Sequence, residues 1–317
     1  MKKGLICGIL GTFLIGLQPI IAIARPSIID PYIFAAITAL IEAIVFLPIY
    51  FFERNRLNKQ KRDQTDCAKI ESLLNGWKKR VNLKLLLIIA ISFSIIPVLL
   101  YIGFELAEAI NSSLALKSEI IFALLFGYLI LKEERISKIQ ILFCFLLFFG
   151  LIIAITQGSF NLLEFNFGVL IIIFTTALFS LIHTITKSAF DRNELFPSQV
   201  VFIRNLSSGT ILLVVYLSIF PLQNLLMLLD FNNFIFFLVM GLDYGFSLFL
   251  WYKTLSYIQI GKAGIINSLT PIISSFFAVL LLGDSFTIFH LIGTTIIIIS
   301  IIMIFRKKKK KVVSKNF

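Results

Sequence analysis

Ten apolar segments, each long enough to cross a lipid bilayer, constrain what this chain can fold into. A transmembrane helix needs about 20 consecutive apolar residues. The chain has 317 residues, of which 58% are hydrophobic and 15% charged, whereas soluble domains average about 45–50% apolar residues. We therefore expect an all-α polytopic membrane protein with ten transmembrane helices. The segments cover approximately residues 4–24, 31–52, 83–103, 109–131, 137–156, 166–187, 197–220, 231–252, 260–282 and 286–305.

The first segment also has features of a signal peptide, because Lys2 and Lys3 precede it and Ala22 to Ala24 resembles a cleavage site. Its apolar run exceeds the roughly 7–15 residues of a signal h-region. A repeat described below also requires this segment. We therefore expect a retained helix, in which Gly4, Gly8 and Gly11 create a close contact with another helix of the same chain.

Lysine and arginine residues fall almost entirely on one side of the ten-span plan. Of the 29 such residues, 26 fall on the side of the termini, in the terminal segments, in the loops or at the span ends on that side. The positive-inside rule then places both termini in the cytoplasm, and we expect the cell membrane as the location. The net charge of +12 is explained by this topology rather than by nucleic-acid binding. The basic tail at 306–317 is expected near anionic lipids of the inner leaflet.

One long loop, at about 53–82, separates the second and third segments. Ile70, Leu73, Leu74, Trp77 and Val81 recur in it at helical spacing, among several basic residues. This pattern predicts a short amphipathic helix on the inner leaflet. A solvated basic linker is the alternative.

The chain contains an internal repeat. At an offset of 150, Glu134 pairs with Asp284, Ser137 with Thr287 and Gln140 with His290; at an offset of 166, Phe13 pairs with Phe179, Pro31 with Pro197 and Thr38 with Arg204. The difference between the offsets falls at the long loop. Five spans per copy are an odd number, so the second copy enters the membrane upside down. We predict two inverted five-helix repeats at 4–156 and 165–305.

These features resemble the drug/metabolite transporter superfamily, specifically proteins with two EamA-type repeats. The Leu-x-Gly-Asp turn at 281–284, Pro271 before it and Arg204 after Pro197 carry the resemblance. Copy one departs from the pattern, with Ile121 in the place of Pro271. The resemblance implies a central cavity lined by spans one, three, four, six, eight and nine, which would bring Gln18 and His183 towards it. It also implies alternating access, in which the two halves rock about a site near the bilayer midplane.

The fourth segment carries charged and polar residues that are costly inside a membrane. Lys117 and Glu119 are two residues apart, so a regular helix would point them to nearly opposite faces. The functional interpretation is that Lys117 binds an anionic group of the substrate and that Glu119 takes up a proton or pairs a cation. Asn111 and Ser113 of the same span are further predicted substrate-binding residues. The alternative is a structural ion pair with another helix, for example between Glu119 and Arg204.

Further candidates lie within other spans. Glu42 is a mid-span carboxylate that either couples a proton or forms a buried pair. Arg204 either extends its charge to the membrane surface or forms a structural pair. Pro271 breaks the ninth span and frees a carbonyl group. The remaining predicted substrate-binding residues are Asp243, Tyr244, Asn267, Thr270, Gln18 and His183, the last of which is either a proton relay or a packing residue.

The predicted function is secondary transport of a small organic solute, coupled to an ion or driven by exchange. The sequence contains no GxxxxGK[ST] motif for nucleotide binding, and its three cysteines have no metal-ligand spacing. We therefore expect no cofactor and no enzymatic activity. A monomer or a weak homodimer is expected. The alternative function is that of a channel or a membrane-embedded sensor.

Overall fold

The computed structural model describes residues 2–62, 67–131, 136–160, 166–258 and 260–305, and every regular element in these ranges is helical. The α-helices are α1 (Lys2–Ala24), α2 (Pro31–Arg62), α3 (Cys67–Asn75), α4 (Arg80–Phe93), α5 (Ile96–Ala107), α6 (Ala109–Ala115), α7 (Glu119–Ile130), α8 (Lys138–Ile155), α9 (Phe167–Asp191), α10 (Pro197–Ile219), α11 (Phe231–Tyr257), α12 (Ile260–Asn267), α13 (Thr270–Phe277) and α14 (Ile288–Phe305). Short 3₁₀ segments are η1 (Gly76–Lys78), η2 (Leu116–Ser118) and η4 (Leu222–Leu229), and η5 (Ala278–Leu282) is a π-helical turn.

The apolar character of these helices confirms a polytopic membrane protein. Within the described residues, nine helical stretches are long and apolar enough to cross a membrane, and a shorter apolar helix, Ile288–Ile304, supplies the tenth. Large apolar side chains cover the outside of the bundle; Leu142 and Phe145, for example, are 62% and 70% exposed. Such exposure is costly in water but suits contact with lipid tails.

Three of the ten spans are broken into shorter helices. The third span breaks between α4 and α5, where Pro97 lies in the first turn of α5. The fourth span breaks at η2, and the ninth breaks between α12 and α13, again with a proline, Pro271, in the first turn of the second piece. A proline lacks the N–H that would continue the preceding helix, and its ring fits the first turn of a new one.

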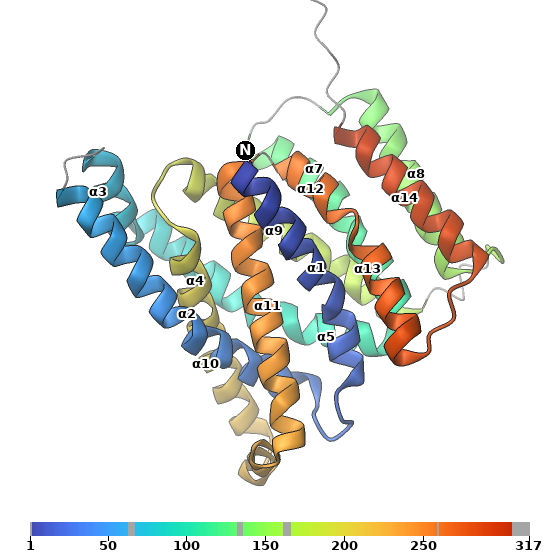
Figure 1. The fold of residues 1–317 in the computed structure, drawn as a ribbon, viewed down its shortest axis with the longest axis horizontal. Coiled ribbons are helices and arrows are strands. Elements are labelled where there is room, and N and C mark those ends of the chain that lie inside the picture. Colours follow the sequence, from blue (N-terminus) through green and yellow to red (C-terminus); the bar gives the residue numbers. More distant parts are fainter. Residues whose placement is uncertain (1, 63–66, 132–135, 161–165, 259, 306–317) are drawn as a thin grey trace, which may run out of the picture.

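The ten spans form one bundle, and the described part of the chain begins and ends at the same end of it (Figure 1). We call this the terminal end: α1 begins there and α14 finishes there. The helices α8 and α14 lie side by side at one edge of the bundle. Their contact is close, since a Cβ on Gly293 would be 2.5 Å from the carbonyl oxygen of Gly150.

The glycines of α1 make the intramolecular contact that was predicted from the sequence. A Cβ at Gly4 would be 2.9 Å from Cβ of Tyr257, and one at Gly8 would be 3.0 Å from the Ile266 side chain. Gly11 faces Leu250 in the same way. The first segment is thus a packed helix of the bundle, set against α11 and α12.

The repeat is visible in matching helix starts. Ser137 and Gln140 form a capping box at the start of α8, with reciprocal bonds between each side chain and the other residue's backbone N–H. At the offset of 150, Thr287 N donates to His290 Nδ1 at 3.1 Å and His290 N donates to Thr287 Oγ1 at 3.4 Å. His290 therefore has a structural role. Glu134, the partner predicted for Asp284, lies outside the described residues, as does the basic tail at 306–317.

The predicted amphipathic helix of the long loop is present but shorter than its sequence pattern. It is α3, followed by η1, and Ile70 and Leu74 are its buried residues. Val81 belongs instead to α4 and is exposed.

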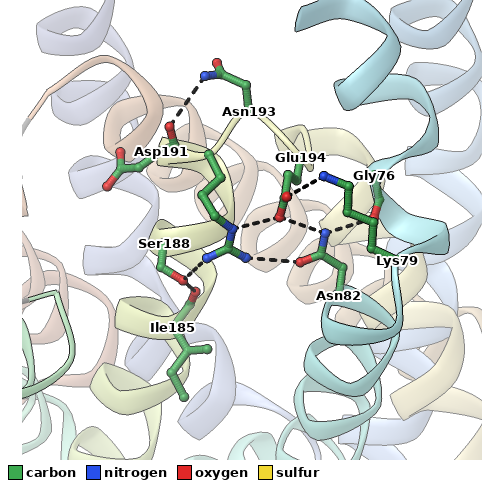
Figure 2. A network of polar contacts seen from close by, with 9 residues as sticks. Gly76, Lys79, Asn82, Ile185, Ser188, Asp191, Asn193 and Glu194 are labelled. Atoms are coloured by element: carbon green, nitrogen blue, oxygen red, sulfur yellow. Dashed lines mark hydrogen bonds and ion pairs between the residues drawn. The ribbon is translucent and has the colours of Figure 1, made fainter. Parts of the chain in front are cut away.

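A polar network at the terminal end joins the start of α4 to the corner between α9 and α10 (Figure 2). The Glu194 carboxylate accepts from Lys79 Nζ at 2.6 Å, from Arg192 Nε at 2.7 Å and from Asn82 Nδ2 at 3.0 Å. Lys79 and Asn82 come from the first half of the chain, whereas Arg192 and Glu194 come from the second. The network therefore fastens the two halves together at this end.

We expect Glu194→Gln to destabilise the protein by about 1 kcal/mol at neutral pH. The Lys79 ammonium, aided by Arg192 and Asn82, lowers the pKa of Glu194 from 4.5 to about 2. A lowered pKa means that the stabilisation is complete above about pH 4.5 and disappears as the pH falls towards about 2. Thermal unfolding of the detergent-solubilised protein should thus show a difference from the parent at pH 7 that shrinks at acidic pH.

The matched control is Glu71→Gln. Glu71 is 58% exposed and pairs with Lys61 at 3.4 Å, so its removal should change the unfolding temperature little at any pH. Equal effects of the two substitutions would contradict a stabilising role for the Glu194 network.

Candidate functional site

The break in the ninth span leaves one backbone carbonyl without its helical partner. In a continuous helix, the carbonyl of Asn267 would accept from the N–H of the residue four positions later, which here is Pro271. The Asn267 carbonyl instead accepts from the Thr270 hydroxyl at 2.7 Å and from the Lys117 ammonium at 2.8 Å. The proline break thus creates an acceptor for a cation inside the bundle.

The break in the fourth span places Lys117 opposite that carbonyl. Lys117 lies in η2, between α6 and α7, and its side chain is almost completely buried at 2% exposure. Lys117 and Asn267 are separated by 150 residues, the offset of the repeat. Equivalent positions of the two inverted copies therefore meet in the centre of the protein, joined by a hydrogen bond from a charged donor.

A cavity of about 60 Å³ adjoins this contact. Its walls come from α1, α5, the η2–α7 segment, α9, α11 and α12, that is, from spans one, three, four, six, eight and nine. This volume suits a few water molecules and is smaller than the roughly 300–1,000 Å³ of pockets that bind small molecules. The lining residues are Ile15, Gln18, Leu100, Phe104, Leu116, Lys117, Glu119, Thr176, Phe179, His183, Tyr244, Ser247, Leu248, Trp251 and Asn267.

Glu119 and His183 face each other in the cavity wall. The carboxylate Oε1 of Glu119 lies 3.6 Å from Nδ1 of His183, and the Trp251 indole N–H donates to the same Nδ1 at 3.1 Å. His183 Nε2 is buried with no partner among the described residues. On the other wall, the Gln18 amide donates to the Ser247 hydroxyl at 2.8 Å.

The expectation that Lys117 and Glu119 point to opposite faces is wrong. Both line the same cavity and interact electrostatically. The face rule holds for an uninterrupted α-helix, whereas here η2 interrupts the helix immediately before Glu119.

Six of the eleven predicted site residues line the cavity: Gln18, Lys117, Glu119, His183, Tyr244 and Asn267. The other five are not brought to it. Ser113 and Thr270 donate to carbonyl groups of their own helical turns. Asn111 Oδ1 and Asp243 Oδ2 are buried without a partner among the described residues. For these four, substrate binding stays a prediction without support from the cavity geometry.

Glu42 belongs to a separate buried cluster with Arg204. The Glu42 carboxylate lies 3.6 Å from Arg204 Nη2 and accepts from Asn205 Nδ2 at 2.6 Å. Arg204 is buried, donates from Nε to Asn205 Oδ1 at 2.7 Å and lies over the Phe93 ring at 3.9 Å. Of the two alternatives for Arg204, the structural pair is therefore correct, and its partner is Glu42 rather than Glu119. This arrangement favours a structural role for Glu42, and ion coupling by Glu42 stays a prediction.

Sequence reasoning missed the aromatic wall of the cavity. Phe104, Phe179 and Trp251 come from three different helices, so no local pattern connects them. A weak signal existed on α11, where Tyr244, Ser247 and Trp251 recur at the spacing of one helix face. Because Tyr244 was already a candidate, the residues three and seven positions after it on the same helix face could have been predicted as well.

A cavity that both halves of a multi-pass helical membrane protein build together is typical of a membrane transporter. The sequence profile of the EamA-like transporter family matches residues 2–156 and again residues 166–306. The chain belongs to the EamA-like transporter family.

Two further similarities accompany the family match. An uncharacterized transporter from Methanothermobacter thermautotrophicus (strain Delta H) is 27% identical over 221 residues, covering 67% of this chain; the match spans 61% of that protein's length. A solved crystal structure superimposes with a TM-score of 0.63 at 10% sequence identity and covers 96% of both chains. At that identity, the similarity shows a shared fold alone.

Proposed function

We propose that this protein is a secondary carrier that moves a small organic solute across the cell membrane by alternating access. The Lys117–Asn267 contact carries the proposal. It joins equivalent positions of two inverted repeats beside the cavity, so rocking of one half against the other would expose the cavity to either side of the membrane in turn. The distribution of basic residues supports a cytoplasmic location for both termini.

The chemistry of the cavity supports a solute with an anionic group. Lys117 is a buried cation whose present acceptor is a neutral carbonyl. An anionic group in its place would form a stronger, charge-assisted pair in a site of low dielectric constant. The aromatic side chains Phe104, Phe179 and Trp251 would contact the apolar part of such a solute.

Counterflow in proteoliposomes tests the carrier function. Vesicles loaded with unlabelled candidate solutes, including small carboxylates and phosphorylated metabolites, should accumulate the labelled form of the true substrate transiently and with saturation. Protein-free vesicles prepared in parallel are the control. Flux that rises linearly with concentration and carries an ohmic current would instead indicate a channel. A solute that stabilises the protein thermally without crossing the membrane would indicate a sensor.

A further inference from the structure

The contact between Glu119, His183 and Trp251 contains two hydrogen-bond acceptors that face each other. An imidazole nitrogen that accepts from an indole N–H carries a lone pair, so the neutral His183 holds its own hydrogen on Nε2. Glu119 Oε1 lies 3.6 Å from the same lone pair on Nδ1. An ionised carboxylate has no hydrogen to place between them, and the two groups then repel each other.

One added proton changes this repulsion into attraction. If the proton binds to Glu119, the neutral carboxyl group can donate it to His183 Nδ1. If the proton binds to Nδ1 itself, an imidazolium lies beside the Glu119 carboxylate, and the Trp251 N–H loses its acceptor. Both forms hold the same single proton, and both lie in the wall of the central cavity.

We infer that Glu119 and His183 together form a proton-binding site of the transport cycle, so that the proton is the coupling ion of the proposed carrier. This inference rests on the proposed function and names its coupling ion.

The surroundings of the pair link proton binding to the solute. Lys117 on η2 interacts with Glu119, and Arg204 on α10 interacts with His183. On α11, the Tyr252 ring lies 5.5 Å from the His183 imidazole, and Tyr244 lines the cavity. Phe104 on α5 and Asn267 on α12 also line the cavity, and neither side chain ionises.

Of the two cations named, Lys117 is the one that lines the cavity. Lys117 and Glu119 both line the cavity, where charges interact more strongly than in water. An anionic group of the solute beside Lys117 would add negative charge to the cavity, so the Glu119–His183 pair would take up a proton more readily. By linkage, proton uptake would in turn strengthen binding of the anionic group.

The two tryptophans of the chain, Trp77 and Trp251, allow a test that needs no known substrate. In Trp77→Phe, all tryptophan emission comes from Trp251, whose N–H bond to His183 is exchanged when the site takes up its proton. The fluorescence of this variant in lipid nanodiscs should show one titration step between about pH 5 and 8. The step should vanish in Trp77→Phe/His183→Gln.

Glu119→Gln provides a second, independent readout in the same background. Glutamine keeps the shape of the side chain but removes the carboxylate that stabilises the imidazolium, so the step should move towards acidic pH by about one unit or more. The matched control is Asp191→Asn, which removes an exposed carboxylate paired with Lys187 on the same helix, and which should leave the step in place.

A flat fluorescence signal, or a step that Glu119→Gln does not move, would overturn the proton site. The counterflow assay separates this failure from failure of the carrier proposal. If the protein shows saturable counterflow but no fluorescence step, it is a carrier that binds no proton at Glu119 and His183. If it shows a Glu119-dependent step but no counterflow, the proton site exists in a protein that is not a carrier.

Discussion

Arg204→Met should lower the free energy of unfolding by about 3–5 kcal/mol, because it leaves a buried carboxylate without its cation. Glu42 and Arg204 are both nearly inaccessible, and Asn205 connects them through bonds of 2.6 and 2.7 Å. Methionine fills much of the same volume against Phe93 but supplies no charge. Chemical or thermal unfolding of the purified protein in detergent would measure the loss.

The double substitution Glu42→Leu/Arg204→Met separates the two roles of this cluster. Replacement of both partners by apolar residues removes the unpaired charge, so most of the lost stability should return. If the cluster is purely structural, this variant should also retain counterflow and its pH dependence. A stable double variant that lost its pH dependence would instead assign ion coupling to Glu42.

The membrane architecture could be predicted from sequence because one physical requirement decides it. A chain crossing lipid must satisfy its backbone polar groups internally, so apolar runs of spanning length become helices. Hydropathy alone could not predict the relative direction of the Lys117 and Glu119 side chains. Hydropathy identifies the fourth span but does not show that it changes to 3₁₀ geometry at Leu116–Ser118, and the relative direction of the two charges depends on that change.

The pairing of the buried charges depended on distances between spans, which no local pattern records. Glu42 and Arg204 lie on α2 and α10, and their pairing requires these two helices to pack together. The repeat already contained a clue, because Pro31 and Pro197 begin these helices at equivalent positions. In an inverted repeat, a symmetry axis relates equivalent helices, and those that lie near the axis can meet across it.

The same symmetry explains the Lys117–Asn267 contact. Both residues had been selected as candidates for separate reasons, Lys117 for its charge and Asn267 for its neighbouring proline. Their separation of 150 residues places them at equivalent positions, which makes them candidates for a contact across the symmetry axis. The aromatic wall offered no comparable relation, since Phe104, Phe179 and Trp251 share neither spacing nor offset.

Lys117→Met is expected to weaken solute binding by about 30- to 150-fold, equivalent to about 2–3 kcal/mol, while the fold persists. The Asn267 carbonyl keeps a donor in the Thr270 hydroxyl at 2.7 Å, so loss of the ammonium leaves no buried acceptor without a partner. Binding is measured as the rise in unfolding temperature that the substrate causes. The parent should show this rise, and Lys117→Met should show it only at far higher solute concentrations.

Lys187→Met is the matched control for this substitution. Lys187 is also a buried lysine that donates to a backbone carbonyl, that of Leu255 at 3.1 Å, but it lies outside the cavity and pairs with Asp191. Its removal should affect stability without weakening solute binding. If Lys117→Met unfolded the protein while Lys187→Met did not, Lys117 would be a structural residue. If Lys117→Met kept both stability and full affinity, the solute would make no use of its charge, and the anionic-group proposal would fail.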